Sequence, residues 1–247
     1  MSDFFIEPSW LSAVKGTRFY YPAAYTDHTE ALAAFQGVID EFWFADVYYP
    51  AGLRIKPALE NVPGFQLIAV ERSGAIDALD ERRKDASGHD FGFLEPSRLI
   101  ERYDRENGRI LTVIRRRGYG QIGLMKEFSE KDLGVFMHRG DSGGEGGSGV
   151  CFLENRKARY EPCGMLFDKL ASRLADESLI VSDGSLCNIK ALKLFSYSRG
   201  NNVSGEDAFR HHQGCEFDFR GFHWSCVGWL GKRYGPTLVW GLKRITN

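Results

Sequence analysis

The chain has 247 residues, a formal net charge of −1 at pH 7 and 43% hydrophobic residues. These values are typical of a globular protein, and they exclude an overall electrostatic attraction to nucleic acid or anionic lipid. The five cysteines form neither a CxxC motif nor zinc-ligand spacing, which argues against a disulfide framework and a zinc knuckle. The sequence has no signal-peptide pattern and no stretch of membrane-spanning length, so we expect a single cytoplasmic domain over residues 1–247.

The first part of the chain alternates between strand and helix patterns. We predict strands at residues 17–22, 41–48 and 65–71. A helix is predicted between the first two, from a cap at Asp27 to about Val38. This strand–helix–strand spacing is typical of a βαβ unit in a parallel sheet.

Residues 72–118 are predicted to form a polar insertion that leads into a β-hairpin. Mixed charges in the first part of this segment indicate a solvated stretch. Asn107-Gly108 then separates strand-like runs at residues 98–104 and 109–115, and Asn-Gly is the strongest short-range hairpin signal.

The rest of the chain continues the alternation and ends in two strands. The predicted elements are a short helix at 119–128, a strand at 133–137, a helix from Pro162 with an apolar stripe of Leu166, Leu170 and Leu174, a strand at 179–181, and an antiparallel pair formed by 215–230 and 236–242. The predicted fold class is therefore α/β, with a mostly parallel sheet flanked by helices, the inserted β-hairpin and the antiparallel C-terminal pair.

A glycine-rich loop at residues 139–149 follows the predicted strand at 133–137. Glycine is used where φ is positive, where backbone N–H groups approach an anion, or where a lid moves. Charged groups of both signs occur in this loop, so we interpret it as a ligand-contacting segment, with a plain surface loop as the alternative.

Aspartates follow four of the predicted strands. Ligands of open parallel sheets bind beyond the carboxyl ends of the strands, so these four carboxylates together predict a polar site. Each of them taken singly is also explained as a helix or turn cap. The four residues are Asp27, Asp46, Asp141 and Asp183.

This order of elements, closed by an antiparallel C-terminal hairpin, resembles the Rossmann-like, S-adenosylmethionine-dependent methyltransferase superfamily. The resemblance covers most of the chain as architecture, without a specific motif. It implies S-adenosylmethionine or a related adenine nucleotide as ligand, and methyl transfer to a nucleotide or nucleic-acid acceptor. No metal is implied.

The resemblance also implies roles for individual residues. Asp46 would accept hydrogen bonds from the ribose hydroxyls of the cofactor. The other implied cofactor contacts are Tyr21, Pro22, Ala23, Asp27 and Asp183. The implied catalytic residues are His138 as base and Asp141 or Glu145 to orient the acceptor. Arg139 and Ser142 would bind the substrate.

Two other enzyme classes share short motifs with the chain. Residues 140–144 match the nucleophile motif of trypsin-like proteases, but the required histidine setting is missing. Residues 136–140 are similar to the arginine-glycine segment that holds NAD in arginine-type ADP-ribosyltransferases, although their Ser-Thr-Ser and Glu-x-Glu motifs are missing. An NAD-using enzyme therefore stays as an alternative. A non-enzymatic protein whose loop 139–149 orders on a partner is a further one.

The most basic segment is Arg115-Arg116-Arg117. Arginines near Tyr103 and Tyr119 predict contacts with the phosphates and bases of a nucleic acid. Local ion pairs with nearby acids are the alternative that we favour.

Overall fold

The structure, a computed structural model, describes residues 4–22, 24, 27–46, 49, 56–60, 62–73, 97–118, 120–139, 166–183, 203–232 and 236–246. Its strands are β1 (Phe4–Ile6), β2 (Arg18–Pro22), β3 (Glu41–Asp46), β4 (Phe65–Ser73), β5 (Ser97–Arg105), β6 (Ile110–Arg117), β7 (Leu133–His138), β8 (Leu174–Ser182), β9 (Glu216–Phe219), β10 (Phe222–Lys232) and β11 (Pro236–Arg244). Its helices are α1 (Pro8–Ala13), α2 (Thr29–Phe35), α3 (Gly120–Glu127), α4 (Leu166–Arg173) and α6 (Gly205–His212).

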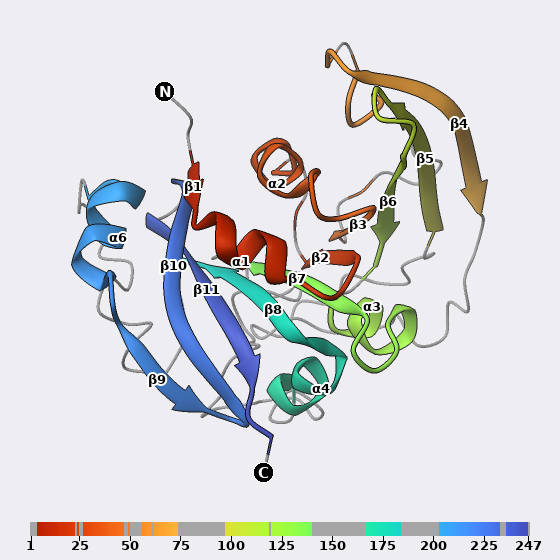
Figure 1. Cartoon of the computed structure of the whole chain (residues 1–247). Coiled ribbons are helices and arrows are strands. Elements are labelled where there is room, and N and C mark those ends of the chain that lie inside the picture. Colours follow the sequence, from red (N-terminus) through yellow and green to blue (C-terminus); the bar gives the residue numbers. More distant parts are fainter. Residues whose placement is uncertain are drawn as a thin grey trace.

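The strands form one 11-stranded sheet. Its order is β1-β10-β11-β8-β7-β2-β3-β6-β5-β4, with β9 paired to β10. Figure 1 shows this sheet running from β10 and β11 (blue) to β4 (orange) at the opposite side. The two ends of this order are β1 and β4, and the C-terminal strands β10 and β11 lie between β1 and the rest of the sheet.

Parallel pairing is confined to the middle of the sheet. Strands β6, β3, β2, β7 and β8 are neighbours in that order, and each neighbouring pair is parallel. Antiparallel strands extend this parallel core on both sides, β11, β10, β9 and β1 on one and β5 and β4 on the other.

The predicted fold class is wrong. Antiparallel pairs outnumber parallel ones, and strands rather than helices make up most of the described chain. A helix-flanked, mostly parallel Rossmann-like sheet is not what forms, and the resemblance to the methyltransferase superfamily is wrong with it. The physical reason is that helices connect only some of the strands. Hairpins connect others, such as β5 to β6 and β10 to β11, and a hairpin reverses the chain.

Several local predictions are confirmed. The parallel β2–α2–β3 unit is present, and the hairpin β5–β6 turns at Gly108 with φ of +74°. The C-terminal strands β10 and β11 pair antiparallel. The strand predicted at 65–71 forms as β4, but it pairs antiparallel with β5 at the edge of the sheet.

Two helix boundaries differ from the prediction. The N-cap of α2 is His28 rather than Asp27, whose carboxylate accepts hydrogen bonds from elsewhere in the fold. The predicted apolar stripe of α4 ends early, because Leu174 is already the first residue of β8. Neither outcome is visible in local spacing alone.

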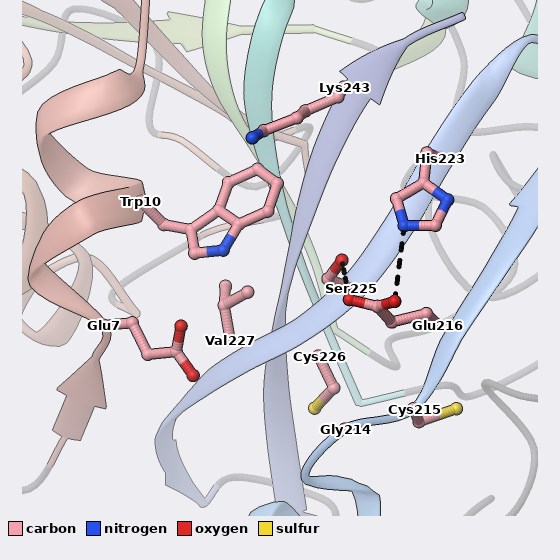
Figure 2. Close-up of a pocket in the computed structure, with 10 residues that line it drawn as sticks. All are labelled: Glu7, Trp10, Gly214, Cys215, Glu216, His223, Ser225, Cys226, Val227 and Lys243. Atoms are coloured by element: carbon pink, nitrogen blue, oxygen red, sulfur yellow. Dashed lines mark hydrogen bonds and ion pairs between the residues drawn. The ribbon is translucent and has the colours of Figure 1, made fainter.

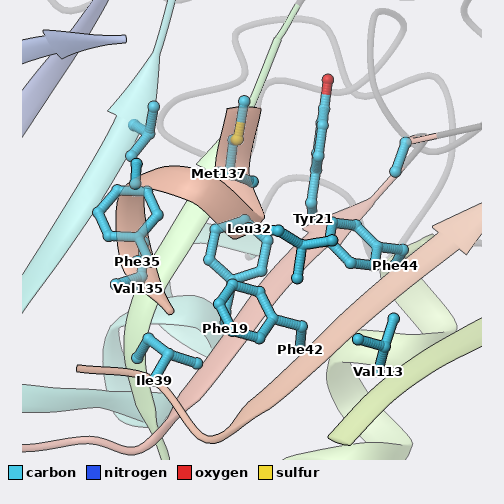
Figure 3. Close-up of a cluster of buried hydrophobic side chains, with 14 of the residues drawn as sticks. Phe19, Tyr21, Leu32, Phe35, Ile39, Phe42, Phe44, Val113, Val135 and Met137 are labelled. Atoms are coloured by element: carbon cyan, nitrogen blue, oxygen red, sulfur yellow. The ribbon is translucent and has the colours of Figure 1, made fainter. Parts of the chain in front are cut away.

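Apolar side chains are buried on both faces of the sheet. Successive residues of β2 point to opposite faces, so Tyr20 joins one hydrophobic cluster and Phe19 and Tyr21 join the other. Helices α3, α4 and α6 contribute to the first cluster. Helix α2 covers the second with Leu32 and Phe35 (Figure 3). Burial on both faces is the reason that β2, β3 and β7 are almost continuously apolar.

Candidate functional site

The carboxyl ends of the parallel strands meet along one edge of the core, which we call the carboxyl edge. Strands β2 and β7 are neighbours, and the chain runs from β2 to β3 on one side of this pair and from β7 to β8 on the other. Such a switch point is where ligands of parallel sheets bind. In register, Asp46 at the end of β3 lies beside Arg117 of β6, and His138 at the end of β7 lies beside Ser182 of β8.

The structure describes seven of the predicted site residues at or beside this edge. They are Tyr21, Pro22, Asp27, Asp46, His138, Arg139 and Asp183. Asp46, His138, Arg139 and Asp183 are all buried. The predicted residues Ala23, Asp141, Ser142 and Glu145, and the loop that follows Arg139, lie outside the described residues. Their predicted roles stay predictions.

Arg139 is fully engaged by the protein. Its Nη1 donates to both carboxylate oxygens of Asp27, at 3.0 and 3.2 Å, and its Nη2 donates to Glu30 at 2.7 Å. Nη2 also donates to the carbonyl of Leu230, and Nε donates to Thr237. Each guanidinium nitrogen thus has an acceptor within the fold. This arrangement does not favour the predicted role of Arg139 in holding a substrate anion, nor the NAD-phosphate role in the ADP-ribosyltransferase alternative.

Arg139 stays positively charged because its pKa is raised. Burial by itself lowers the pKa of this guanidinium, but the attraction of Asp27, supported by Tyr21 and Glu30, outweighs burial and raises the pKa above its usual value. Arg139 therefore ties the end of β7 to the start of α2.

Tyr21 connects the core to the same carboxylate. Its hydroxyl donates to Oδ2 of Asp27 at 2.7 Å. Figure 3 shows the ring among Phe44, Leu32 and Met137, with the hydroxyl pointing away from the cluster. The predicted cofactor contacts Tyr21 and Asp27 are thus brought together.

Beyond β3 lies a second polar group of side chains. Asp46 is 1% exposed, and Tyr49, three residues later, is 3% exposed. Burial raises the pKa of the Tyr49 hydroxyl, and the negative charge of Asp46 raises it further, so the phenol is neutral at physiological pH. Sequence reasoning missed Tyr49.

His28 lies on the same side of the core. Its ring centroid is 5.6 Å from that of Phe44 in β3. Burial, helped by the positive charge of Arg115, lowers the pKa of His28 to about 4, although Asp27 opposes the shift. His28 is therefore neutral at physiological pH. No sequence signal identified it, because it lies in a turn without a motif.

Two arginines of the basic segment are used inside the fold. Nη2 of Arg115 donates to both carboxylate oxygens of Glu101, at 2.8 and 2.9 Å, and the two side chains are 4% and 2% exposed. Arg116 is buried against Glu127, at 3.2 Å. The favoured alternative of local ion pairs is confirmed for these two residues. The nucleic-acid contact predicted for Arg115, Arg116 and Arg117 stays a prediction.

A pocket of about 330 Å³ lies elsewhere, between α1 and strands β9, β10 and β11. Figure 2 shows Glu216 paired with both Ser225 and His223. Glu216 accepts from the Ser225 hydroxyl at 3.1 Å and lies 3.7 Å from Nε2 of His223. The ammonium of Lys243 lies 5.0 Å from the ring centroid of Trp10. Glu216, Ser225, His223 and Lys243 thus contact other residues of the pocket lining.

Within the ranges that the structure describes, no three His, Cys, Asp or Glu side chains are grouped to hold a metal ion. Among the same residues, no helix has the length and apolar character needed to cross a membrane. Comparison of the chain with protein-family models, with curated proteins and with solved structures finds no match.

Proposed function

We propose that the carboxyl edge binds a small adenosine-containing ligand that carries no net negative charge, and that S-adenosylmethionine is its first candidate. The observation that carries the proposal is Asp46, a buried carboxylate at the end of a parallel strand next to the switch point. A carboxylate at this place suits the vicinal hydroxyls of a ribose, because it accepts two hydrogen bonds.

The charges at the edge favour this class over nucleotide phosphates. Arg139 is engaged by Asp27 and Glu30, and Arg115 is engaged by Glu101. A phosphate brought here would meet carboxylates whose neighbouring guanidinium groups already have partners, and burying an uncompensated charge is costly. A positively charged sulfonium or a neutral nucleoside avoids that cost. The proposal depends on these charges and not on membership of a family.

The experiment is a thermal-shift titration of the purified full chain. The ligands are S-adenosylmethionine, S-adenosylhomocysteine, adenosine, ATP, NAD and ADP-ribose. A ligand at a hundred times its Kd raises Tm by about 5–10 °C in a chain of this size. We expect this shift with the adenosyl compounds and a smaller one with the three phosphate-bearing ligands.

Asp46→Asn is the test variant, since it keeps the size of the side chain and removes its charge. Asp218→Asn is the matched control, because Asp218 lies on β9 with its side chain 68% exposed. The shift should shrink in the first variant and persist in the second. The proposal fails if no adenosyl compound shifts Tm, or if Asp46→Asn leaves the shift unchanged. A shift with NAD alone would support the NAD-using alternative instead.

A further inference from the structure

The buried polar atoms without a hydrogen-bond partner in the described part of the chain include one on a residue that follows β3 and one on the residue that precedes α2. These two are the hydroxyl oxygen of Tyr49 and Nδ1 of His28. The Tyr49 side chain is 3% exposed, so water does not readily replace the missing partner. Buried polar groups in folded proteins are almost always hydrogen-bonded, so each exception needs an explanation.

Both side chains are associated with the second hydrophobic cluster. Tyr49 packs in the same hydrophobic cluster as Phe44, and the ring of His28 contacts that phenylalanine. The charges of Arg115 and Asp27 also contribute to the pKa shifts of both side chains. Asp46, the central residue of the proposed ligand site, also raises the pKa of Tyr49.

Two other buried tyrosines, Tyr103 and Tyr21, have hydrogen-bond partners for their hydroxyl groups. Tyr103, also buried, has a hydroxyl that donates to Glu101 at 3.1 Å and accepts from the N–H of Leu59 at 3.3 Å. Tyr21 donates to Asp27. Within the described residues, the Tyr49 hydroxyl differs from these two in having no partner, so it can donate to a ligand.

Both groups are neutral at physiological pH. The Tyr49 hydroxyl is then a donor, and His28 with its ring proton on Nε2 offers Nδ1 as an acceptor. A donor and an acceptor together match a ligand edge with an acceptor nitrogen next to an amino group. The Watson–Crick edge of adenine has this pattern.

We propose that Tyr49 and His28 bind the base of the ligand, with the Tyr49 hydroxyl donating to a ring nitrogen and Nδ1 of His28 accepting from the exocyclic amine. This inference rests on the proposed function, in which Asp46 holds the ribose. It names the aminopurine edge as the recognised group, so inosine, which carries an oxygen in place of the amine, should bind less tightly than adenosine.

The test uses Tyr49→Phe, which removes only the hydroxyl. An unsatisfied buried hydroxyl destabilises the unliganded protein, so we expect Tm without ligand to rise by about 2–4 °C. The same variant should bind adenosine or S-adenosylmethionine about tenfold more weakly. Tyr103→Phe is the matched control, because removing its partnered hydroxyl should lower Tm. His28→Leu should also weaken binding, and His28→Asn, which keeps a polar atom near the Nδ1 position, should recover part of the loss.

The outcomes separate the two proposals. If adenosine binds in an Asp46-dependent way but Tyr49→Phe and His28→Leu bind it as tightly as the unchanged chain, the inference is wrong and the proposed function stands. If Tyr49→Phe lowers Tm as Tyr103→Phe does, the hydroxyl has an internal role and the inference is again wrong. If no adenosyl compound binds the unchanged chain, the proposed function fails and takes this inference with it. Equal affinity for inosine and adenosine would show that the exocyclic amine is not recognised, and the role proposed for His28 would be wrong.

Discussion

The guanidinium of Arg139 lies against the carboxylate of Asp27, 112 residues earlier in the chain, with Nη1 at 3.0 and 3.2 Å from the two carboxylate oxygens. This pair joins the end of β7 to the turn before α2, across the switch point of the parallel core. Every guanidinium nitrogen of Arg139 has an acceptor within the fold, so the pair is a structural contact, and its removal should be measured first as a loss of stability.

Arg139→Met should reduce the free energy of unfolding by about 3–5 kcal/mol, because Asp27 and Glu30 would keep their charges without a partner. Urea denaturation followed by circular dichroism measures this change. Arg210→Met is the control, since Arg210 pairs with Glu206 on the surface of α6 with its side chain 68% exposed. That variant should lose about 0.3–0.5 kcal/mol. Equal losses in both variants would contradict the structural role of Arg139.

The buried pair of Arg115 and Glu101 predicts a non-additive double mutant. Arg115→Met should be destabilising by about 3–5 kcal/mol, because Glu101 would remain charged in the interior. Glu101→Gln in the same chain should recover most of this loss, since glutamine keeps an oxygen for the N–H of Ala58 and removes the charge. Urea denaturation of Arg115→Met, Glu101→Gln and the double variant gives a double-mutant cycle, which measures the interaction energy of the pair. Additive losses would show that the two side chains do not depend on each other.

His28 predicts a loss of stability in mild acid. The pKa of this group is about 4 in the folded chain and about 6.5 in the unfolded one, so only the unfolded chain takes up the proton between these values. Stability contributed by His28 is therefore complete above pH 6.5 and falls as pH decreases toward 4, by at most about 1.4 kcal/mol per pH unit.

His28→Asn removes this titration. The difference in unfolding free energy between the unchanged chain and the variant should be constant from pH 8 to 7 and should move in favour of the variant from pH 6 to 5. Urea denaturation at each pH measures it. A difference that is the same at every pH would mean that His28 is not buried in its neutral form.

Close backbone contact between two glycines predicts a strong effect of one methyl group. A Cβ on Gly134 of β7 would lie 2.1 Å from the carbonyl oxygen of Gly16, so the segment before β2 would have to move. Gly134→Ala should cost about 1–3 kcal/mol. At Gly37 a Cβ would meet nothing within 4 Å, so Gly37→Ala should change stability by no more than about 0.5 kcal/mol. Thermal denaturation of the two variants compares them directly, and equal Tm values would refute the contact.

Parts of the candidate site were predictable because they depend on strand ends. The apolar runs that became β2, β3, β7 and β8 end at polar residues, and parallel pairing brings those ends to one edge. Asp46 and Asp183 were found in this way. Tyr49 and His28 were not, because the missing hydrogen-bond partner of a side chain can be recognised only when all its neighbours are placed.

The sequence by itself determined the features that are local. Asn107-Gly108 specified a hairpin because few residues tolerate the positive φ of that turn, and almost continuous apolar runs specified strands that are buried on both faces. Only the tertiary structure decided which strands became neighbours and in which direction, as with β4 against β5 at the edge. It also decided that Arg139 would be used by Asp27, Glu30 and Leu230. The physical reason is that strand pairing and buried ion pairs join segments that are distant in the chain, whereas residue periodicity records only which face of an element is buried.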